Sequence, residues 1–143
     1  MRLMGAYIIK CEEIIKDDAG NIAEIRCTAD LETGNGNPVD GRKIKGTIHW
    51  LSAKNAVPTT LRLYSQLTTL ENPSELPEGK TYTDFLNPES LEIVEGALVE
   101  KSLADVPAGE KFQFVRDGYY VKDSKYENTF NRVVGLKDSF PKN

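Results

Sequence analysis

The stretch that decides the fold class is YIIKCEEIIKDDAGNIAEIRCTA, residues 7–29. Its apolar and polar side chains alternate on both sides of residues 17–21, which are rich in residue types that tolerate left-handed backbone angles. Alternation with a period of two is typical of strands, so the stretch predicts a β-hairpin. A hairpin centred on Ala19 places Cys11 directly opposite Cys27.

The two cysteines and the single histidine, His49, are too few for a four-ligand zinc site, and two thiols do not make a secreted disulfide framework. We therefore expect reduced, half-buried thiols and no metal. His49 has no placed acid or base partner in the sequence, which favours a structural histidine over a general base.

Further alternating runs follow along the chain, separated by turn signals. Residues 59–69 also fit a helical stripe, but their threonines and the alternation of Leu61 with Leu63 favour a strand. The Gly-rich and Pro-containing stretch 32–41 reads as a loop that links two sheets. Short helical turns are expected near residues 82–86 and 102–105. The other predicted strands are 44–51, 90–97, 111–116, 119–121 and 130–134, and the set predicts an all-β, barrel-like module.

The charge pattern separates the chain into blocks. The formal net charge is −4, which argues against a protein that coats nucleic acid over its whole surface. Residues 41–70 nevertheless contain five basic side chains and no carboxylate, which predicts one positive face. The alternative is a strand edge protected by Lys and Arg. As possible RNA backbone contacts we single out Arg42, Lys43 and Lys45.

No apolar run approaches the roughly 18 residues that a membrane-spanning helix needs, and the first residues do not form a signal peptide. We therefore expect a cytoplasmic protein with no membrane partner. The chain contains no nucleophile elbow, no P-loop, no dinucleotide fingerprint and no zinc-protease motif. We predict no catalytic residue in it.

Motifs along nearly the whole chain resemble one family, the C-terminal anticodon-binding region of glutaminyl-tRNA synthetases. The longest is DGRKIKGTIHWLS at residues 40–52. The others follow in the same order as in that family: Arg2-Leu3 with Ala6-Tyr7, Pro58 with residues 61–64, residues 87–91, residues 112–114 with Arg116 and Gly118-Tyr119, and residues 130–132 with 135–138.

The resemblance implies a fold of one or two anticodon-binding β-barrels resembling the ribosomal protein L25-like fold. It implies that residues 1–143 form a C-terminal region, either one compact unit or one complete barrel with part of a second. The catalytic half, which uses ATP and magnesium to join glutamine to its tRNA, is absent from these residues, and this chain itself is expected to hold no cofactor. The implied partners are glutamine-specific tRNA and that catalytic half, not DNA.

Three residues of this chain match anticodon-reading positions of the family. Arg2 matches a contact to the first anticodon base, and Gln113 and Arg116 match residues that take part in binding the central base. Where the family often has a second basic residue, this chain has Met4, which removes a cationic donor. Alternation also predicts that Gln113 points away from Phe112 and Phe114.

Other interpretations remain open at this stage. Without the resemblance, Gln113 is an exposed amide and Arg116 a surface cation paired with Asp117 or another carboxylate. The chain could then be a structural or protein-interaction β-barrel without autonomous RNA binding, as its net negative charge and acidic residues 71–110 allow. A free-standing enzyme is disfavoured because no nucleophile and base can be named. The related glutamyl-tRNA synthetases share the architecture, but the motifs favour the glutaminyl kind.

Overall fold

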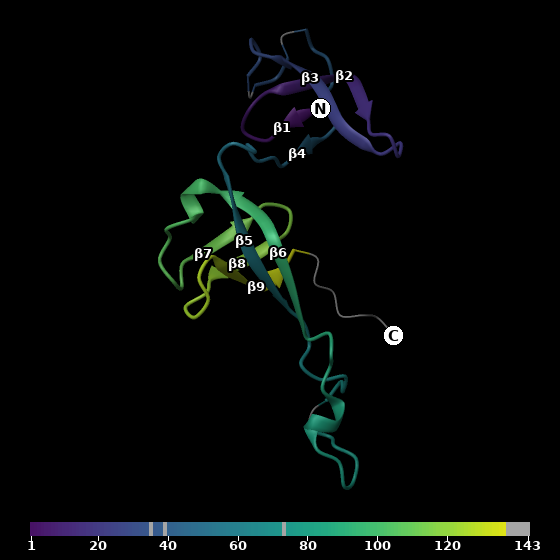
Figure 1. Ribbon diagram of the computed structural model, residues 1–143, viewed down its shortest axis with the longest axis vertical. Helices are drawn as coiled ribbons and strands as arrows, with labels where there is room; N and C mark the ends of the chain where they lie inside the picture. Colours follow the sequence, from purple (N-terminus) through teal and green to yellow (C-terminus); the bar gives the residue numbers. More distant parts are fainter. Residues whose placement is uncertain (35, 39, 73, 137–143) are drawn as a thin grey trace. The chain divides into compact units, whose positions relative to one another are not determined.

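The computed structural model describes residues 1–34, 36–38, 40–72 and 74–136. The chain divides into two compact units, an N-terminal unit of residues 1–50 and a C-terminal unit of residues 51–143. The described residues form β-strands and two short 3₁₀ turns, so the all-β prediction is confirmed (Figure 1). Among them, no helix has the length and apolar character needed to cross a membrane.

The N-terminal unit is built on the predicted hairpin. Its sheet has the order β3-β2-β1-β4. Cys11 pairs with Cys27 in the antiparallel register of β2 and β3, as predicted. The Asp17 carboxylate accepts hydrogen bonds from the backbone N–H groups of Ala19 and Asn21, which fixes the turn and lowers the pKa of Asp17. The strands are β1 (Arg2–Leu3), β2 (Ile8–Lys16), β3 (Ile22–Asp30) and β4 (Thr47–Ile48).

The prediction for the loop 32–41 is wrong in one respect, because this segment connects β3 to β4 of the same sheet and does not link two sheets. β4 pairs in parallel with β1, and a parallel partner requires a long returning connection. The loop is anchored where Asp30 accepts hydrogen bonds from the backbone and hydroxyl of Thr33. Its positions 35 and 39 lie outside the described residues.

The C-terminal unit contains a mixed five-stranded sheet with the order β6-β5-β9-β8-β7. β5 runs antiparallel to β6 and parallel to β9, although β9 lies far along the chain. The strand predicted over 59–69 therefore exists, but it begins and ends earlier. The strands are β5 (Ala56–Tyr64), β6 (Leu91–Glu100), β7 (Lys111–Phe114), β8 (Gly118–Lys122) and β9 (Thr129–Gly135).

Aromatic side chains form the core of the C-terminal unit. Tyr120 and Phe130 are each 1% exposed. Phe114 stacks on Tyr120 with ring centroids 4.3 Å apart, and Phe112 meets Phe130 edge-on at 6.0 Å. Burial of aromatic area is the main source of stability for a sheet of this size. Neither of the two described sheets closes into a complete barrel, so the fold is all-β and barrel-like with open edges.

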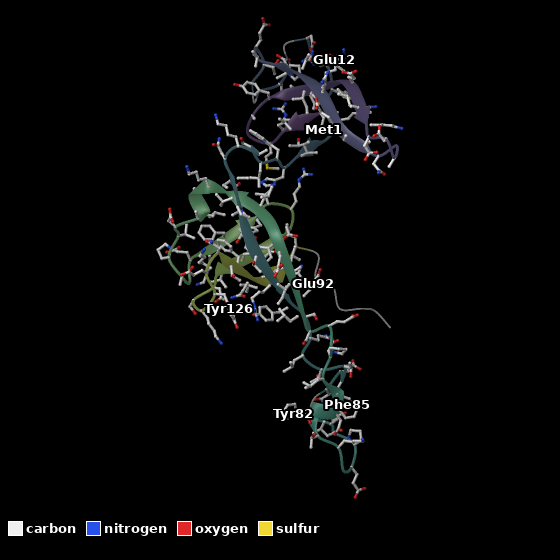
Figure 2. The ribbon with its side chains drawn as sticks, in the orientation of Figure 1. Met1, Glu12, Tyr82, Phe85, Glu92 and Tyr126 are labelled. Carbon is white, nitrogen blue, oxygen red and sulfur yellow. The ribbon has the colours of Figure 1, made fainter. Side chains whose placement is uncertain are left out.

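Residues 65–90 connect β5 to β6 by a long excursion that extends beyond the ends of these two strands (Figure 1). The two sides of the excursion are joined by an isolated bridge between Thr68 and Leu86. The excursion contains the 3₁₀ turn η1 (Tyr82–Phe85), whose first and last residues are labelled in Figure 2. A second 3₁₀ turn, η2 (Lys101–Leu103), follows β6, so both predicted helical turns are present within one or two residues.

Candidate nucleic-acid interface

The β7–β8 hairpin, residues 111–122, presents Gln113 on the outer face of the five-stranded sheet. Gln113 is exposed, whereas its neighbours Phe112 and Phe114 are half-buried and contact the core ring of Phe130. The predicted alternation is therefore confirmed. The backbone of Gln113 is held between two core aromatic anchors and its amide is presented outward, which suits it to reading the edge of a base.

Arg116 lies in the tight turn of this hairpin and adopts a left-handed backbone conformation, with φ of 69°. The turn is closed by a hydrogen bond of 3.0 Å from the N–H of Asp117 to the carbonyl oxygen of Phe114. Positive φ at the third residue of such a turn is the feature of type II turns, where glycine is preferred. Arginine here costs about 1–2 kcal/mol of backbone strain relative to a right-handed position.

The Arg116 side chain is exposed and forms no ion pair among the residues that the structure describes. The pairing with Asp117 considered from the sequence is not observed, because the Asp117 carboxylate accepts a hydrogen bond from the Tyr120 hydroxyl. Burial of Tyr120 and this hydrogen bond raise the pKa of the phenol far above its ordinary value. Within this hairpin, Asp117 is therefore hydrogen-bonded to Tyr120, and the Arg116 side chain is exposed to solvent.

Tyr119, which the sequence analysis did not assign to the site, lies directly opposite Gln113 in the β7–β8 register. Tyr119 is 46% exposed, on the same outer face as Gln113. Exposed tyrosine beside a planar amide is a pairing that can stack a base and hydrogen-bond its edge. The alternation of Tyr119 with buried Tyr120 is the sequence signal that marks it as outward-facing.

A cross-sheet row extends this outer face through all five strands. The register pairs place one residue of each strand side by side: Ile93, Arg62, Asn131, Val121 and Lys111. The row depends on the parallel pairing of β5 with β9, which no local pattern reveals. The sequence alone therefore could not show that Arg62 lies on this surface.

Arg62 is the centre of an aromatic cluster on that row. Its Nε donates a hydrogen bond of 2.9 Å to the Tyr64 hydroxyl, and its guanidinium lies 4.7 Å from the ring centroid of Tyr126, which is labelled in Figure 2. The hydrogen bond to Tyr64 raises the pKa of Arg62. The Asn131 amide donates to Asp123, and this bond lowers the pKa of the Asp123 carboxyl. The cluster combines a cation with two exposed rings.

In the N-terminal unit, Arg2 lies on β1 and its guanidinium donates a hydrogen bond of 2.7 Å to the carbonyl oxygen of Gly36. Arg2, Arg42 and Lys43 line a shallow cavity of about 490 Å³. Three of the basic residues predicted from the sequence are thus brought to one concave surface, which favours an anionic or hydrogen-bond-accepting ligand. Met4 is 36% exposed, and its carbonyl oxygen accepts a hydrogen bond from the Trp50 indole.

The five cations of residues 41–70 are divided between the two units. Arg42, Lys43 and Lys45 belong to the N-terminal unit, whereas Lys54 and Arg62 belong to the C-terminal unit. Arg42 is ion-paired with Asp40 at 3.0 Å and with Asp30. Lys43 and Lys45 are exposed and have no ion pair within the described part of the chain.

His49 follows β4, because the strand predicted over 44–51 is limited to Thr47–Ile48. His49 is exposed. Within the described ranges, no group of three or more His, Cys, Asp or Glu side chains is arranged to hold a metal ion.

Comparison with known proteins identifies the family. The profile of "tRNA synthetases class I (E and Q), anti-codon binding domain" matches residues 47–123. The chain is 47% identical over 146 aligned positions to glutamine–tRNA ligase of Vibrio vulnificus, 46% over 144 to that of Clostridium kluyveri and 45% over 146 to that of Escherichia coli. These alignments include 98–99% of this chain but only 26% of each relative, so the chain spans about a quarter of their length. It therefore belongs to the anticodon-binding domain family of the class I tRNA synthetases for glutamate and glutamine.

Proposed function

We propose that this chain binds the anticodon loop of a glutamine-accepting tRNA, as the C-terminal part of a cytoplasmic glutamine–tRNA ligase. The relatives named glutamine–tRNA ligase support the glutamine specificity. A catalytic half outside these residues binds ATP and magnesium and joins glutamine to the tRNA. The chain itself contributes recognition.

The observation that carries the proposal is the exposed group formed by Gln113, Tyr119 and Arg116 on one hairpin. Arg116 occupies a backbone position that favours glycine, yet its side chain reaches no described acid. A strained, exposed cation beside an exposed amide and ring is readily explained by an external anionic or planar ligand. An unstacked anticodon base offers the planar face, the hydrogen-bonding edge and the adjacent phosphate that these three groups recognise.

In this proposal Gln113 and Arg116 contact the central anticodon base and Tyr119 stacks on it. Arg2 reads the first base from the N-terminal unit, where Arg42 and Lys43 line the same cavity. Lys43 and Lys45 supply attraction to the phosphate backbone. Each contact follows from a side chain that is exposed or lines a cavity in its own unit.

The test is a salt titration of binding to three RNAs: glutamine tRNA, the same tRNA with its central anticodon base changed, and an unrelated tRNA. We expect the cognate tRNA to bind tighter than the altered one by about 1–3 kcal/mol. Gln113→Ala should remove most of that difference while leaving the weaker binding to the altered tRNA unchanged. Equal binding to all three RNAs, or none, would favour a protein-interaction module instead.

A further inference from the structure

The register of the β2–β3 hairpin places two thiols directly across from one another. Cys11 and Cys27 are direct Cα partners in adjacent antiparallel strands, and both are free. Partners in such a ladder have Cα atoms about 4.5 or 5.5 Å apart, depending on the type of pair. Both separations fall within the roughly 4.4–6.8 Å that a disulfide spans.

The two sulfur atoms also lean toward the same end of the hairpin. The Cys11 sulfur lies 3.9 Å from the carbonyl oxygen of Glu13, and the Cys27 sulfur lies 4.0 Å from that of Ile25. Because the strands are antiparallel, both carbonyls lie on the side of the hairpin turn. The register of β2 with β3 shifts between Cys11 and Glu13, where a β-bulge bends the strand next to Cys11.

Both cysteines are exposed and line one open cavity of about 1110 Å³ in the N-terminal unit. This corrects the prediction of half-buried thiols. The cavity is of the size that small organic molecules occupy, and its lining includes Ile25, Ala29 and Ile48. A low-molecular-weight disulfide can therefore reach either sulfur.

We propose that Cys11 and Cys27 form a reversible dithiol–disulfide site that reacts with low-molecular-weight disulfides of the glutathione type. This site does not involve Gln113, Tyr119 or Arg116, although Arg42 lines both its cavity and the cavity near Arg2. The thiols remain reduced in a reducing compartment and close when the ratio of small disulfide to small thiol rises.

The reaction consists of two successive thiol–disulfide exchanges. The thiolate of one cysteine attacks a sulfur of oxidised glutathione, so a protein–glutathione disulfide forms, the glutathione S–S bond breaks and one glutathione thiolate leaves. The second cysteine then attacks the protein sulfur, forming the Cys11–Cys27 bond and releasing the second glutathione. The two cysteines are oxidised, one glutathione disulfide is reduced to two thiols, and the two cysteine protons end on those thiols.

The test treats the dilute, reduced full chain with oxidised glutathione and measures its intact mass and its titratable thiols. We expect both thiols to be lost, the mass to fall by two hydrogens with no adduct retained, and non-reducing digestion to give a peptide pair joined through Cys11 and Cys27. Addition of excess reduced dithiol should restore both thiols.

The matched control moves one thiol by a single residue. Thr28 pairs with Lys10 and donates a hydrogen bond to Glu12, so it lies on the opposite face of the hairpin. The double variant Cys27→Ser/Thr28→Cys keeps two exposed thiols at almost the same separation along the chain, and it should accumulate glutathione adducts. Persistent adducts on both wild-type cysteines, disulfide-linked dimers, or internal closure of the double variant as fast as that of the wild type would overturn the proposal.

Discussion

The Tyr120 hydroxyl donates a hydrogen bond to the Asp117 carboxylate, so the acid adjacent to Arg116 is engaged by a residue of its own hairpin. Asp117 would otherwise be the nearest counter-ion to Arg116 along the chain. Since Tyr120 is also a core residue, the same side chain anchors the hairpin and withholds the carboxylate from the cation. This arrangement leaves the Arg116 side chain exposed beside an acid that is already hydrogen-bonded to Tyr120.

Arg116→Gly separates the function of the side chain from the stability of the turn. Glycine accepts a φ of 69° without strain, so the variant should be as stable as the wild type or more stable by up to about 1 kcal/mol. We expect discrimination between cognate and altered anticodons to fall by about 1–3 kcal/mol. Urea unfolding and tRNA binding, measured on the same samples, check both parts. Discrimination equal to that of the wild type would remove Arg116 from the site.

Tyr119→Ala should weaken tRNA binding by about 1–3 kcal/mol, because it removes a ring that can stack on an unpaired base. Tyr119→Phe is the matched control, since it keeps the ring and loses only the hydroxyl, and it should bind nearly as well as the wild type. Fluorescence anisotropy with a labelled anticodon stem-loop measures both. If the two variants lose the same affinity, the hydroxyl and not the ring makes the contact.

Three basic side chains of the N-terminal unit, Arg42, Lys43 and Lys45, should differ in their effect on the salt dependence of tRNA binding. Lys43→Ala or Lys45→Ala should reduce the log–log salt slope of tRNA binding by about 0.7 for each phosphate that the lysine neutralises. Arg42→Ala should change this slope less, because Asp30 and Asp40 already neutralise its guanidinium. A salt titration of the three variants checks this order. The prediction is wrong if Arg42→Ala gives the largest change.

Tyr120 should make the stability of the C-terminal unit sensitive to alkali. Burial first, and the hydrogen bond to Asp117 second, raise the pKa of its phenol in the folded state. The contribution of Tyr120 to the free energy of unfolding is therefore complete below about pH 10, the pKa of tyrosine in the unfolded chain. Above that pH the contribution declines by up to about 1.4 kcal/mol per pH unit. Tyr120→Phe cannot ionise and lacks the hydrogen bond to Asp117. The variant should be less stable at about pH 8 by roughly 1–3 kcal/mol.

The gap between wild type and Tyr120→Phe should narrow as the pH rises from about 8 to about 11. Urea midpoints at several pH values measure this gap in stability. Amide exchange within β8 and β9 is a second measurement. A gap that stays constant over this range would contradict the raised pKa of Tyr120.

Gly118→Ala should disturb the hairpin through a close backbone approach. A Cβ at this position would lie 2.7 Å from the carbonyl oxygen of Val134, so β9 or β8 must shift. We expect a loss of about 1–3 kcal/mol in the free energy of unfolding. Gln113→Ala, at an exposed position of the same hairpin, serves as the control and should change stability by no more than about 0.5 kcal/mol. Equal stability of the two variants would show that the strands adjust without cost.

The parts of the fold that depend on short-range pattern could be predicted. The register of Cys11 with Cys27 follows from period-two alternation and the turn at Asp17, and the outward direction of Gln113 follows from its flanking phenylalanines. The return of loop 32–41 to the same sheet could not be predicted, because it depends on the parallel pairing of β1 with β4. Of the site, the resemblance supplied Arg2, Gln113 and Arg116 as candidates.

The neighbours of these candidates required three-dimensional structure. Arg62 and Asn131 are side by side only because β5 pairs with β9, and Arg42 meets Asp30 only because the loop folds back. The left-handed conformation of Arg116 was also not evident, since arginine is not a residue that marks positive φ. Sequence pattern therefore identified individual side chains better than the partners that surround them.

Because β5 pairs with β9, one strand of this pair is synthesised on the ribosome well before the other. The Thr59 hydroxyl donates to the carbonyl oxygen of Asn128, 69 residues further along the chain. At typical bacterial or eukaryotic elongation rates, on the order of 3–14 s pass between the synthesis of β5 and that of β9. Until β9 is made, β6 is the only partner of β5 from its own sheet, and at least one edge of β5 stays open to other chains. Nascent or truncated forms that end before residue 129 should therefore be the aggregation-prone species of this protein.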